Sequence, residues 1–538
     1  MTFKSYTNYF YKHLYSLYRD GYRHSSKKAQ EKTLQFKDIQ KELRSDRSRI
    51  LYSSAFRRLQ QKAQVFSMET NSNVRSRLTH SLEVADLGRR LSDQITDTMK
   101  DRQEHNERIP GFRTEESAFV GSIVENACLM HDIGNPPFGH FGESAIQDWA
   151  LHEAQEAMPA GMVYDDYLEG LMADFREFDG NPQGFRMVTR LLGDNGLCLT
   201  ASTLLCALKY ARTTGESNMR GKEEPGILKK AGWFQTEQNL VKRLVDEVGR
   251  SINTRYPLTY IMEAADDISY CMSDIADGIE KRILTEEQFI LTFCKQWEAM
   301  NEKKKAEKAE AIKKGEEGAD KLVGTMQLPR EIRKFYSGGH VKTEKLKGFN
   351  LDFAIDWATR ATEQAAENYK THSAEVEAGT AEPLMSYDSE MVRVLKVIGK
   401  VCCELLYPSI EAESIELTGY AVISGIIEKH IRLLKLSYED FTKVVEGDRK
   451  KFPVETRMYN RFDEGCTNAY KRAVAALKNK LEKNESQDED ERKKQYARFA
   501  QEEWWLRVHL LVDHISSMTD AYALETYQML EGIALMRT

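Results

Sequence analysis

Apolar residues along most of the chain recur every three to four positions, and strand-like alternation is scarce. This spacing places the apolar side chains on one face of an α-helix. Glycine and proline, which interrupt helices, supply only 32 and 11 of the 538 residues. The pattern therefore predicts a nearly all-α protein.

Three segments depart from this pattern and are interpreted as inserts or exposed connections. Residues 300–321 contain almost no large apolar side chain, which predicts a solvated helix or a disordered segment. Residues 372–383 predict a loop, and residues 484–495 predict a charged surface stretch. We expect a helical core over residues 1–330 and a separate C-terminal helical lobe over residues 331–538.

Composition narrows the class of protein. Apolar residues make up 41% and charged residues 30% of the chain, as in soluble globular proteins. No stretch is apolar enough for a membrane span, and the first twenty residues lack the apolar core of a signal peptide. Eight scattered cysteines suggest a reducing, cytoplasmic compartment rather than a disulfide framework. The net charge of -7 argues against a nucleic-acid binder as a whole, although a local basic groove is compatible with it.

Two predicted helices carry polar residues suited to metal binding. Residues 76–91 form an amphipathic helix that bears His80. Its apolar positions include Leu78, Leu82 and Ala85. Residues 116–130 are apolar until His131 and Asp132, after which a glycine and two prolines end the helix. His131 and Asp132 therefore lie at the end of a buried helix, where an unpaired carboxylate is costly.

A third predicted helix, residues 258–281, carries Asp266, Tyr270 and Asp274 close to one face. Aspartate is a poor residue for the middle of a helix, so its presence needs a reason. Two imidazoles and two carboxylates suit a divalent first-row metal with open positions for water and substrate. Each residue alone could be an ordinary helix histidine or surface acid. Together, the set predicts a metal site of His80, His131, Asp132 and Asp266.

The turn after this histidine–aspartate pair reads GNPPFGHFGES and places His140 and Glu143 three residues apart at the start of a new helix. A histidine oriented by a carboxylate is typical of a general acid or base. Glu143 could instead simply favour the helix N-terminus through its charge. The residues alone leave both interpretations open.

Taken in order, these motifs resemble the deoxyguanosine triphosphate triphosphohydrolases, a branch of the HD-domain phosphohydrolases. The similarity rests on RSRLTHSLEVA (75–85), LMHDIGNPPFGHFGE (129–143), FDGNPQGFR (178–186) and MEAADDISY (262–270). It begins with YSSAFRRLQQKAQVF (52–66), continues through SIELTGYAVISGIIE (414–428), and reaches DHISSMTDAYALETY (513–527). The resemblance implies an HD-type helical core and hydrolysis of dGTP at the α-phosphorus, giving deoxyguanosine and inorganic triphosphate.

The resemblance also implies roles for individual residues. His140 and Glu143 become catalytic residues beside the attacking water. Contacts to phosphate or other parts of the substrate fall on Arg77, Asn181, Lys209, Tyr210 and Lys230, with Lys229 as an equally good candidate for the last. The deoxyribose is expected to meet Gln64, Tyr270 and Asp274, where a packed ring leaves no room for a 2′-hydroxyl. Glu416 and Arg449 are expected to read the donors and acceptors of guanine, Arg449 from the same chain or a neighbouring subunit.

The same resemblance implies a divalent metal (Mn²⁺, Mg²⁺ or Co²⁺, with Fe²⁺ also suited to the ligands), a homo-oligomer such as a hexamer, and compatibility with single-stranded DNA binding. Three alternatives stay open. The first is a broad-specificity dNTP triphosphohydrolase. The second is an HD phosphodiesterase, which FDGNPQGFR and HFGE disfavour. The third is a DNA-binding regulatory protein with a degenerate metal site, which the complete ligand set disfavours. No GxxxxGK[ST] segment is present, so a P-loop NTPase is not predicted.

Overall fold

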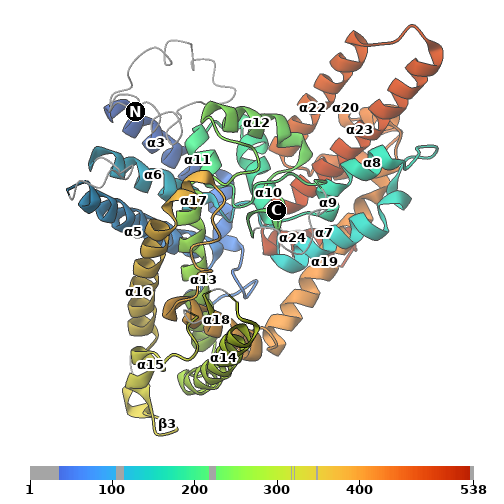
Figure 1. Cartoon of the computed structure of the whole chain (residues 1–538). Helices are drawn as coiled ribbons and strands as arrows, with labels where there is room; N and C mark the ends of the chain where they lie inside the picture. Colours follow the sequence, from blue (N-terminus) through green and yellow to red (C-terminus); the bar gives the residue numbers. More distant parts are fainter. Residues whose placement is uncertain are drawn as a thin grey trace.

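The computed structural model describes residues 36–104, 114–216, 226–316, 318–319, 322–346 and 349–533. These ranges are mostly helical (Figure 1), which confirms the predicted all-α class. Their strands are the short β1 (Asp194–Leu197) and the antiparallel pair β2 (Tyr336–Ser337) and β3 (His340–Val341). The first twenty residues, assessed above for a signal peptide, lie outside the described residues.

Three long helices form the centre of the N-terminal part. α5 (Arg77–Glu104) packs against α6 (Thr114–Met130) and α13 (Thr259–Glu280). α3 (Phe36–Leu51) packs on α6, and α16 (Phe349–Thr371) packs on α5 and α13. The prediction that Leu82 belongs to the buried apolar face of α5 is wrong, because its side chain is 49% exposed.

Shorter elements connect these helices and surround the turn that follows α6. They are α4 (Ser54–Arg58), α7 (His140–His152), α8 (Asp166–Leu171), α9 (Ala173–Arg176), α10 (Gly180–Arg186), the π-helical segment η3 (Met187–Leu191), α11 (Ala201–Cys206) and α12 (Gln238–Glu247). α7 packs on α9, and α10 runs directly into η3. This part of the chain therefore changes direction often.

The remaining helices fall into two groups (Figure 1). The first group lies near α13 and α16 and comprises α14 (Glu286–Lys314), α15 (Arg330–Phe335), α17 (Ser373–Ala378), α18 (Glu390–Val401) and the π-helical segment η8 (Cys402–Leu406). The second group comprises α19 (Ile410–Leu434), α20 (Tyr438–Glu446), α21 (Pro453–Tyr459), α22 (Glu464–Lys483), α23 (Glu489–Ser516) and α24 (Asp520–Leu530). α19 packs on α7 and α24, and α22 packs along α23.

The predictions for the three segments interpreted as inserts or exposed connections agree with the structure to different degrees. Residues 300–314 continue α14 as a solvated helix that ends at Gly315 in the left-handed conformation, whereas residues 317, 320 and 321 lie outside the described residues. The loop predicted over 372–383 is wrong at its start, because α17 occupies Ser373–Ala378. Alanine and glutamate favour that short helix, and Gly379 at φ +74° ends it. Residues 484–495 are mostly exposed, as predicted.

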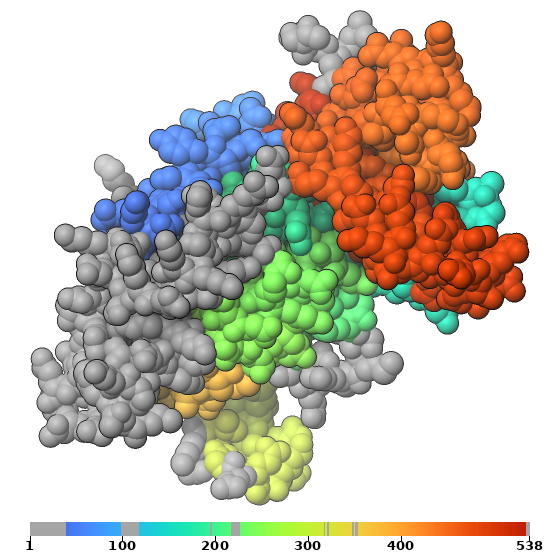
Figure 2. Space-filling view, turned by 90° about the horizontal axis from the view of Figure 1, so that it is seen from above, coloured from blue at the N-terminus to red at the C-terminus, as the bar shows by residue number. Residues whose placement is uncertain are grey.

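The hydrophobic core is continuous from Ile39 to Ala523. Segments far apart in the sequence also meet directly: Arg58 lies 2.7 Å from Asp463, and Figure 2 shows a blue segment of the N-terminal part beside an orange-red segment of the C-terminal part. The domain boundary expected near residue 330 stays a prediction. All eight cysteines are free. The helices in the described ranges include none with both the length and the apolar character needed to cross a membrane.

Candidate active site

A cleft of about 420 Å³ gathers polar residues from segments far apart in the sequence, between Ala63 and Glu416. This volume falls within the usual range for small-molecule sites. The predicted site residues that line it are Gln64, Arg77, His80, His131, Asp132, His140, Glu143, Asn181, Lys209, Tyr210, Lys230, Asp266, Tyr270 and Glu416. Asp274 and Arg449 do not line it.

Three of these residues form a group that could hold a metal ion. The ligand atoms of His80, His131 and Asp266 all lie within 4.8 Å of one another. Oδ1 of Asp266 lies 3.3 Å from Nε2 of His80 and 3.4 Å from Nε2 of His131. Burial alone would raise the pKa of Asp266, but Lys209 and the two imidazoles hold that pKa well below its usual range. The group therefore offers two ring nitrogens and an ionised carboxylate.

The local structure orients His131 toward this group. Its Nδ1 donates to the carbonyl of Cys128 at 2.7 Å, one turn back on α6. In the neutral ring this leaves Nε2 as an acceptor, and Nε2 is buried without a hydrogen-bond partner. A buried unpartnered nitrogen facing a carboxylate is costly unless the nitrogen is protonated or a cation lies between them. The donor set therefore fits a divalent metal.

Asp132 lies beside the group with both of its oxygens engaged. Its Oδ2 accepts from Arg77 at 3.0 Å, and its Oδ1 accepts from the amide of Asn135. Oδ1 is 3.7 Å from Nε2 of His131. Asp132 is thus outside the three-residue group, and its place as a fourth ligand stays a prediction.

The turn after His131 brings Arg77 close to the backbone. Phe138 and Gly139 both have positive φ, of 61° and 57°, and a Cβ atom at residue 139 would meet the Arg77 guanidinium at 3.0 Å. Positive φ is strained for phenylalanine, and such strain is typical of functional sites. The peptide N–H of Phe138 donates to Asp520 at 3.1 Å, which ties this turn to α24.

His140 and Glu143 form the predicted pair at the start of α7. Nδ1 of His140 donates to Oε2 of Glu143 at 2.7 Å, and this hydrogen bond raises the pKa of His140. Oε1 of Glu143 accepts from the N–H of Gly180 at 2.8 Å. The Glu143 side chain is buried, whereas that of His140 is 84% exposed. Glu143 is therefore fixed by two partners and holds an imidazole that water can reach.

Positive charge borders the cleft on more than one side. Lys209, which follows α11, lies 3.2 Å from Oδ2 of Asp266. Lys230 pairs with Asp179, the residue that caps α10, and Asn181 donates to the same carboxylate at 2.6 Å. Lys229 is exposed and does not line the cleft, so Lys230 is the better of the two candidates.

A tyrosine pair forms another wall. The hydroxyl of Tyr270 lies 2.9 Å from that of Tyr407, and Tyr407 donates to Oδ2 of Asp274 at 2.7 Å. Asp274 is fully buried, and its burial raises its pKa to about 6. Asp274 thus contacts the cleft through Tyr407 rather than directly. Its Oδ1 is buried without a partner, as is Oε1 of Gln64, which lines the cleft.

Sequence reasoning missed several residues of the site. Tyr407 follows the π-helical segment η8, and nothing in its local pattern marked it. Asp179 lies within FDGNPQGFR but was not singled out, although its capping position next to Lys230 makes it part of the cleft. Arg449, by contrast, lies in an exposed turn away from the residues that line the cleft. Its predicted contact with a base would need a neighbouring subunit.

Comparison with protein families identifies a domain in the N-terminal part of the chain. Residues 77–159 match the model of the HD domain. The match begins at the first residue of α5 and extends beyond α7, so it includes His80, His131, Asp132, His140 and Glu143. Asp266 lies outside the matched range, and the fold brings it into contact with the two histidines. The chain therefore contains an HD domain, the helical domain of metal-dependent phosphohydrolases.

Proposed function

We propose that this protein is a dGTP triphosphohydrolase that releases deoxyguanosine and inorganic triphosphate. The proposal rests on one observation: three groups of side chains lie in the same cleft. These are the metal-binding group, the His140–Glu143 pair and the cations Arg77, Lys209 and Lys230. A triphosphate needs several positive partners, and the chemistry at phosphorus needs a group that moves a proton. The choice of dGTP rests on the motifs that resemble the dGTP triphosphohydrolases.

The phosphate chain would lie against the cations. A divalent metal held by His80, His131 and Asp266, with Asp132 as the proposed fourth ligand, would supply positive charge at the reacting phosphate when bound. Arg77 would contact the α-phosphate, because Asp132 holds its guanidinium beside the metal group. Lys209 and Lys230, with Tyr210 and Asn181, would contact the remaining phosphates.

His140 would move the proton. Its exposed imidazole is within reach of water, and Glu143 keeps Nδ1 protonated so that Nε2 faces the reacting atoms. Glu143 is itself fixed by the amide of Gly180, so the pair needs little reorganisation during the reaction. General acid–base catalysis of this kind contributes about 10²–10⁴-fold in rate.

The tyrosine wall would recognise the sugar. Tyr270 lines the cleft and is held by Tyr407, which suits a ring packed against deoxyribose where a 2′-hydroxyl would need space. Asp274 would act through Tyr407, and Gln64 offers a buried unpartnered oxygen in the same cleft. Such a wall would select deoxynucleotides by steric exclusion.

Recognition of the base is proposed for Glu416. It lines the cleft from α19, and burial raises the pKa of its carboxyl group. Arg449 would take part only if a neighbouring subunit supplied it, as the proposed homo-oligomer allows. The exposed position of Arg449 also favours the second candidate, a dNTP triphosphohydrolase of broad specificity, because one carboxylate reads a base less completely than two groups do.

The test is a comparison of the four dNTPs and GTP as substrates, with Mn²⁺ and Mg²⁺ in parallel. The proposal predicts the highest kcat/KM for dGTP and little turnover of GTP. Equal values for all four dNTPs would replace dGTP selectivity with the broad-specificity alternative. Turnover of a cyclic or signalling nucleotide but of no dNTP would contradict both.

A further inference from the structure

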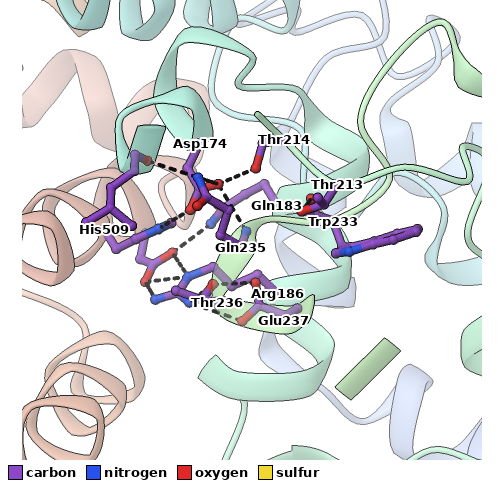
Figure 3. Close-up of polar contacts among 12 residues, drawn as sticks. Asp174, Gln183, Arg186, Thr213, Thr214, Trp233, Gln235, Thr236, Glu237 and His509 are labelled. Atoms are coloured by element: carbon purple, nitrogen blue, oxygen red, sulfur yellow. Dashed lines mark hydrogen bonds and ion pairs between the residues drawn. The ribbon is translucent and has the colours of Figure 1, made fainter. Parts of the chain in front are cut away.

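The short helix α10 connects the cleft to the interior of the protein. At its first residue, the N–H of Gly180 donates to Glu143, and the capping residue Asp179 pairs with Lys230. Farther along the helix, the side chains of Gln183 and Arg186 reach into a buried polar network (Figure 3). A change at the buried end of α10 can therefore reach the proposed catalytic pair.

Both buried side chains donate hydrogen bonds to one carboxylate, that of Asp513 on α23. Oδ1 of Asp513 accepts from Nε2 of Gln183 at 3.1 Å and from Nε of Arg186 at 2.9 Å. Its Oδ2 accepts from Nη2 of Arg186 at 2.8 Å. Gln183 and Asp513 have no exposed surface, and Arg186 is 6% exposed. Hydrogen bonds between ionised groups in such surroundings are strong and directional.

The opposite side of α10 is in close contact with another segment, so the helix cannot shift in that direction. Gly134, in the turn that carries the metal-binding histidine, packs directly on this helix. A Cβ atom added at Gly134 would come within 2.0 Å of the backbone nitrogen of Gly184 and 2.1 Å of the carbonyl oxygen of Gly180. α10 is thus held between the active-site turn and Asp513, and a shift at one surface must move the helix at the other.

We propose that Asp513 is a positioning residue for the active site. It holds α10 through Gln183 and Arg186 so that the N–H of Gly180 meets Glu143, which in turn orients His140. This inference rests on the proposed catalytic role of the His140–Glu143 pair. Asp513 touches neither the cleft's metal-binding group nor its cations, so its effect should fall on turnover rather than on binding.

The test compares Asp513→Asn with a matched control, Glu503→Gln, on the same helix. Glu503 is also a buried acid paired with a buried arginine, Arg507, but that pair binds Tyr470 and the backbone carbonyl of Leu436 instead of α10. With dGTP, Asp513→Asn should lower kcat about tenfold to a hundredfold while KM changes little, because small misplacements of catalytic groups have effects of this size. Glu503→Gln should leave kcat within about twofold of the wild-type value, since it does not touch α10.

A double mutant separates positioning from general destabilisation. If Asp513 acts through Glu143, Asp513→Asn should lower kcat much less in a Glu143→Gln background than in the wild type. Additive losses, or equal losses in Asp513→Asn and Glu503→Gln, would overturn the inference. If Asp513→Asn does not fold, Gln183→Ala removes one contact and keeps the Arg186 pair, and a several-fold loss of kcat is expected; wild-type kcat would overturn the inference.

Amide hydrogen exchange over residues 179–187 gives a readout that does not depend on activity. Faster exchange there in Asp513→Asn, but not in Glu503→Gln, is expected if Asp513 holds α10. Unchanged exchange would overturn the inference. Should the wild-type protein fail to hydrolyse dGTP, the proposed function would be wrong, and hydrogen exchange alone would decide whether Asp513 positions this helix.

Discussion

Nε2 of His131 and Oδ1 of Asp266 lie 3.4 Å apart, although His131 follows the end of α6, Asp266 lies on α13, and only His131 falls within the matched HD domain. The hydrogen bond from Nδ1 to Cys128 turns the other ring nitrogen toward the carboxylate. His80 approaches the same oxygen from α5. The packing of α5 and α6 against α13 thus brings the metal-binding group together.

Asp266→Ala should abolish metal binding, because it removes the carboxylate that both histidines face. The measurement is the metal content of the purified protein by elemental analysis after dialysis against Mn²⁺. The adjacent Asp267→Asn is the control, since Asp267 lies outside the three-residue group and the metal should remain. Unchanged metal content in Asp266→Ala would show that the ion is held elsewhere.

His140→Ala should keep the metal and lose most turnover. Its imidazole is the proposed proton-transfer group, so kcat for dGTP should fall about 10²–10⁴-fold while metal content stays the same. His152→Ala, at the exposed end of the same helix, should behave like the wild-type protein. A near-normal rate in His140→Ala would remove His140 from the mechanism.

Tyr270→Ala should weaken the discrimination against ribonucleotides. Removing the ring opens the space that a 2′-hydroxyl would need, so the ratio of kcat/KM for dGTP to that for GTP should fall about tenfold or more. Tyr270→Phe keeps the ring and loses the hydroxyl contacts with Tyr407 and Asp274, so it should largely retain the ratio. If both variants leave the ratio at its wild-type value, the sugar is recognised by other residues.

His430 should make the protein sensitive to mild acid. Burial lowers the pKa of this histidine from 6.5 to about 4 in the folded protein. The unfolded chain therefore binds a proton that the folded protein does not between these pH values, so this contribution to stability is complete above pH 6.5 and is lost as the pH falls toward 4. The slope is about 1.4 kcal/mol per pH unit for one proton.

The corresponding experiment is urea unfolding of the wild-type protein and His430→Phe at pH 6.5 and pH 5. The phenylalanine ring can keep the stacking on Phe462 and cannot take up a proton. The free energy of unfolding of the wild-type protein should fall by roughly 2 kcal/mol more than that of the variant over this interval. His514 also has a lowered pKa, but this residue is present in both proteins. Equal losses would contradict the assignment.

The sequence predicted the parts of this site that depend on local pattern. His80 and Asp266 lie on the predicted helices α5 and α13, and His131 directly follows the predicted helix α6, so their local setting and their chemistry could both be predicted. The His140–Glu143 pair follows from a spacing of three at a helix start. In each case the informative neighbours are a few positions away in the sequence.

The rest depends on contacts between distant segments, which a single sequence does not display. Tyr407 reaches the cleft because η8 packs on α13, and Asp513 reaches α10 from a helix more than 300 residues later. The same limit explains why Arg449 was assigned to the base by its residue type, although it lies on an exposed turn. The short helix α17 was missed because its six residues are too few to display a helical repeat.

The most direct test of the proposed function is hydrolysis of dGTP in water enriched in ¹⁸O. The products are separated, and their masses are measured by mass spectrometry. Attack at the α-phosphorus predicts unlabelled deoxyguanosine and inorganic triphosphate that carries one ¹⁸O. Labelled deoxyguanosine would contradict attack at phosphorus. Formation of dGMP with pyrophosphate, or of dGDP with phosphate, would contradict the proposed triphosphohydrolase.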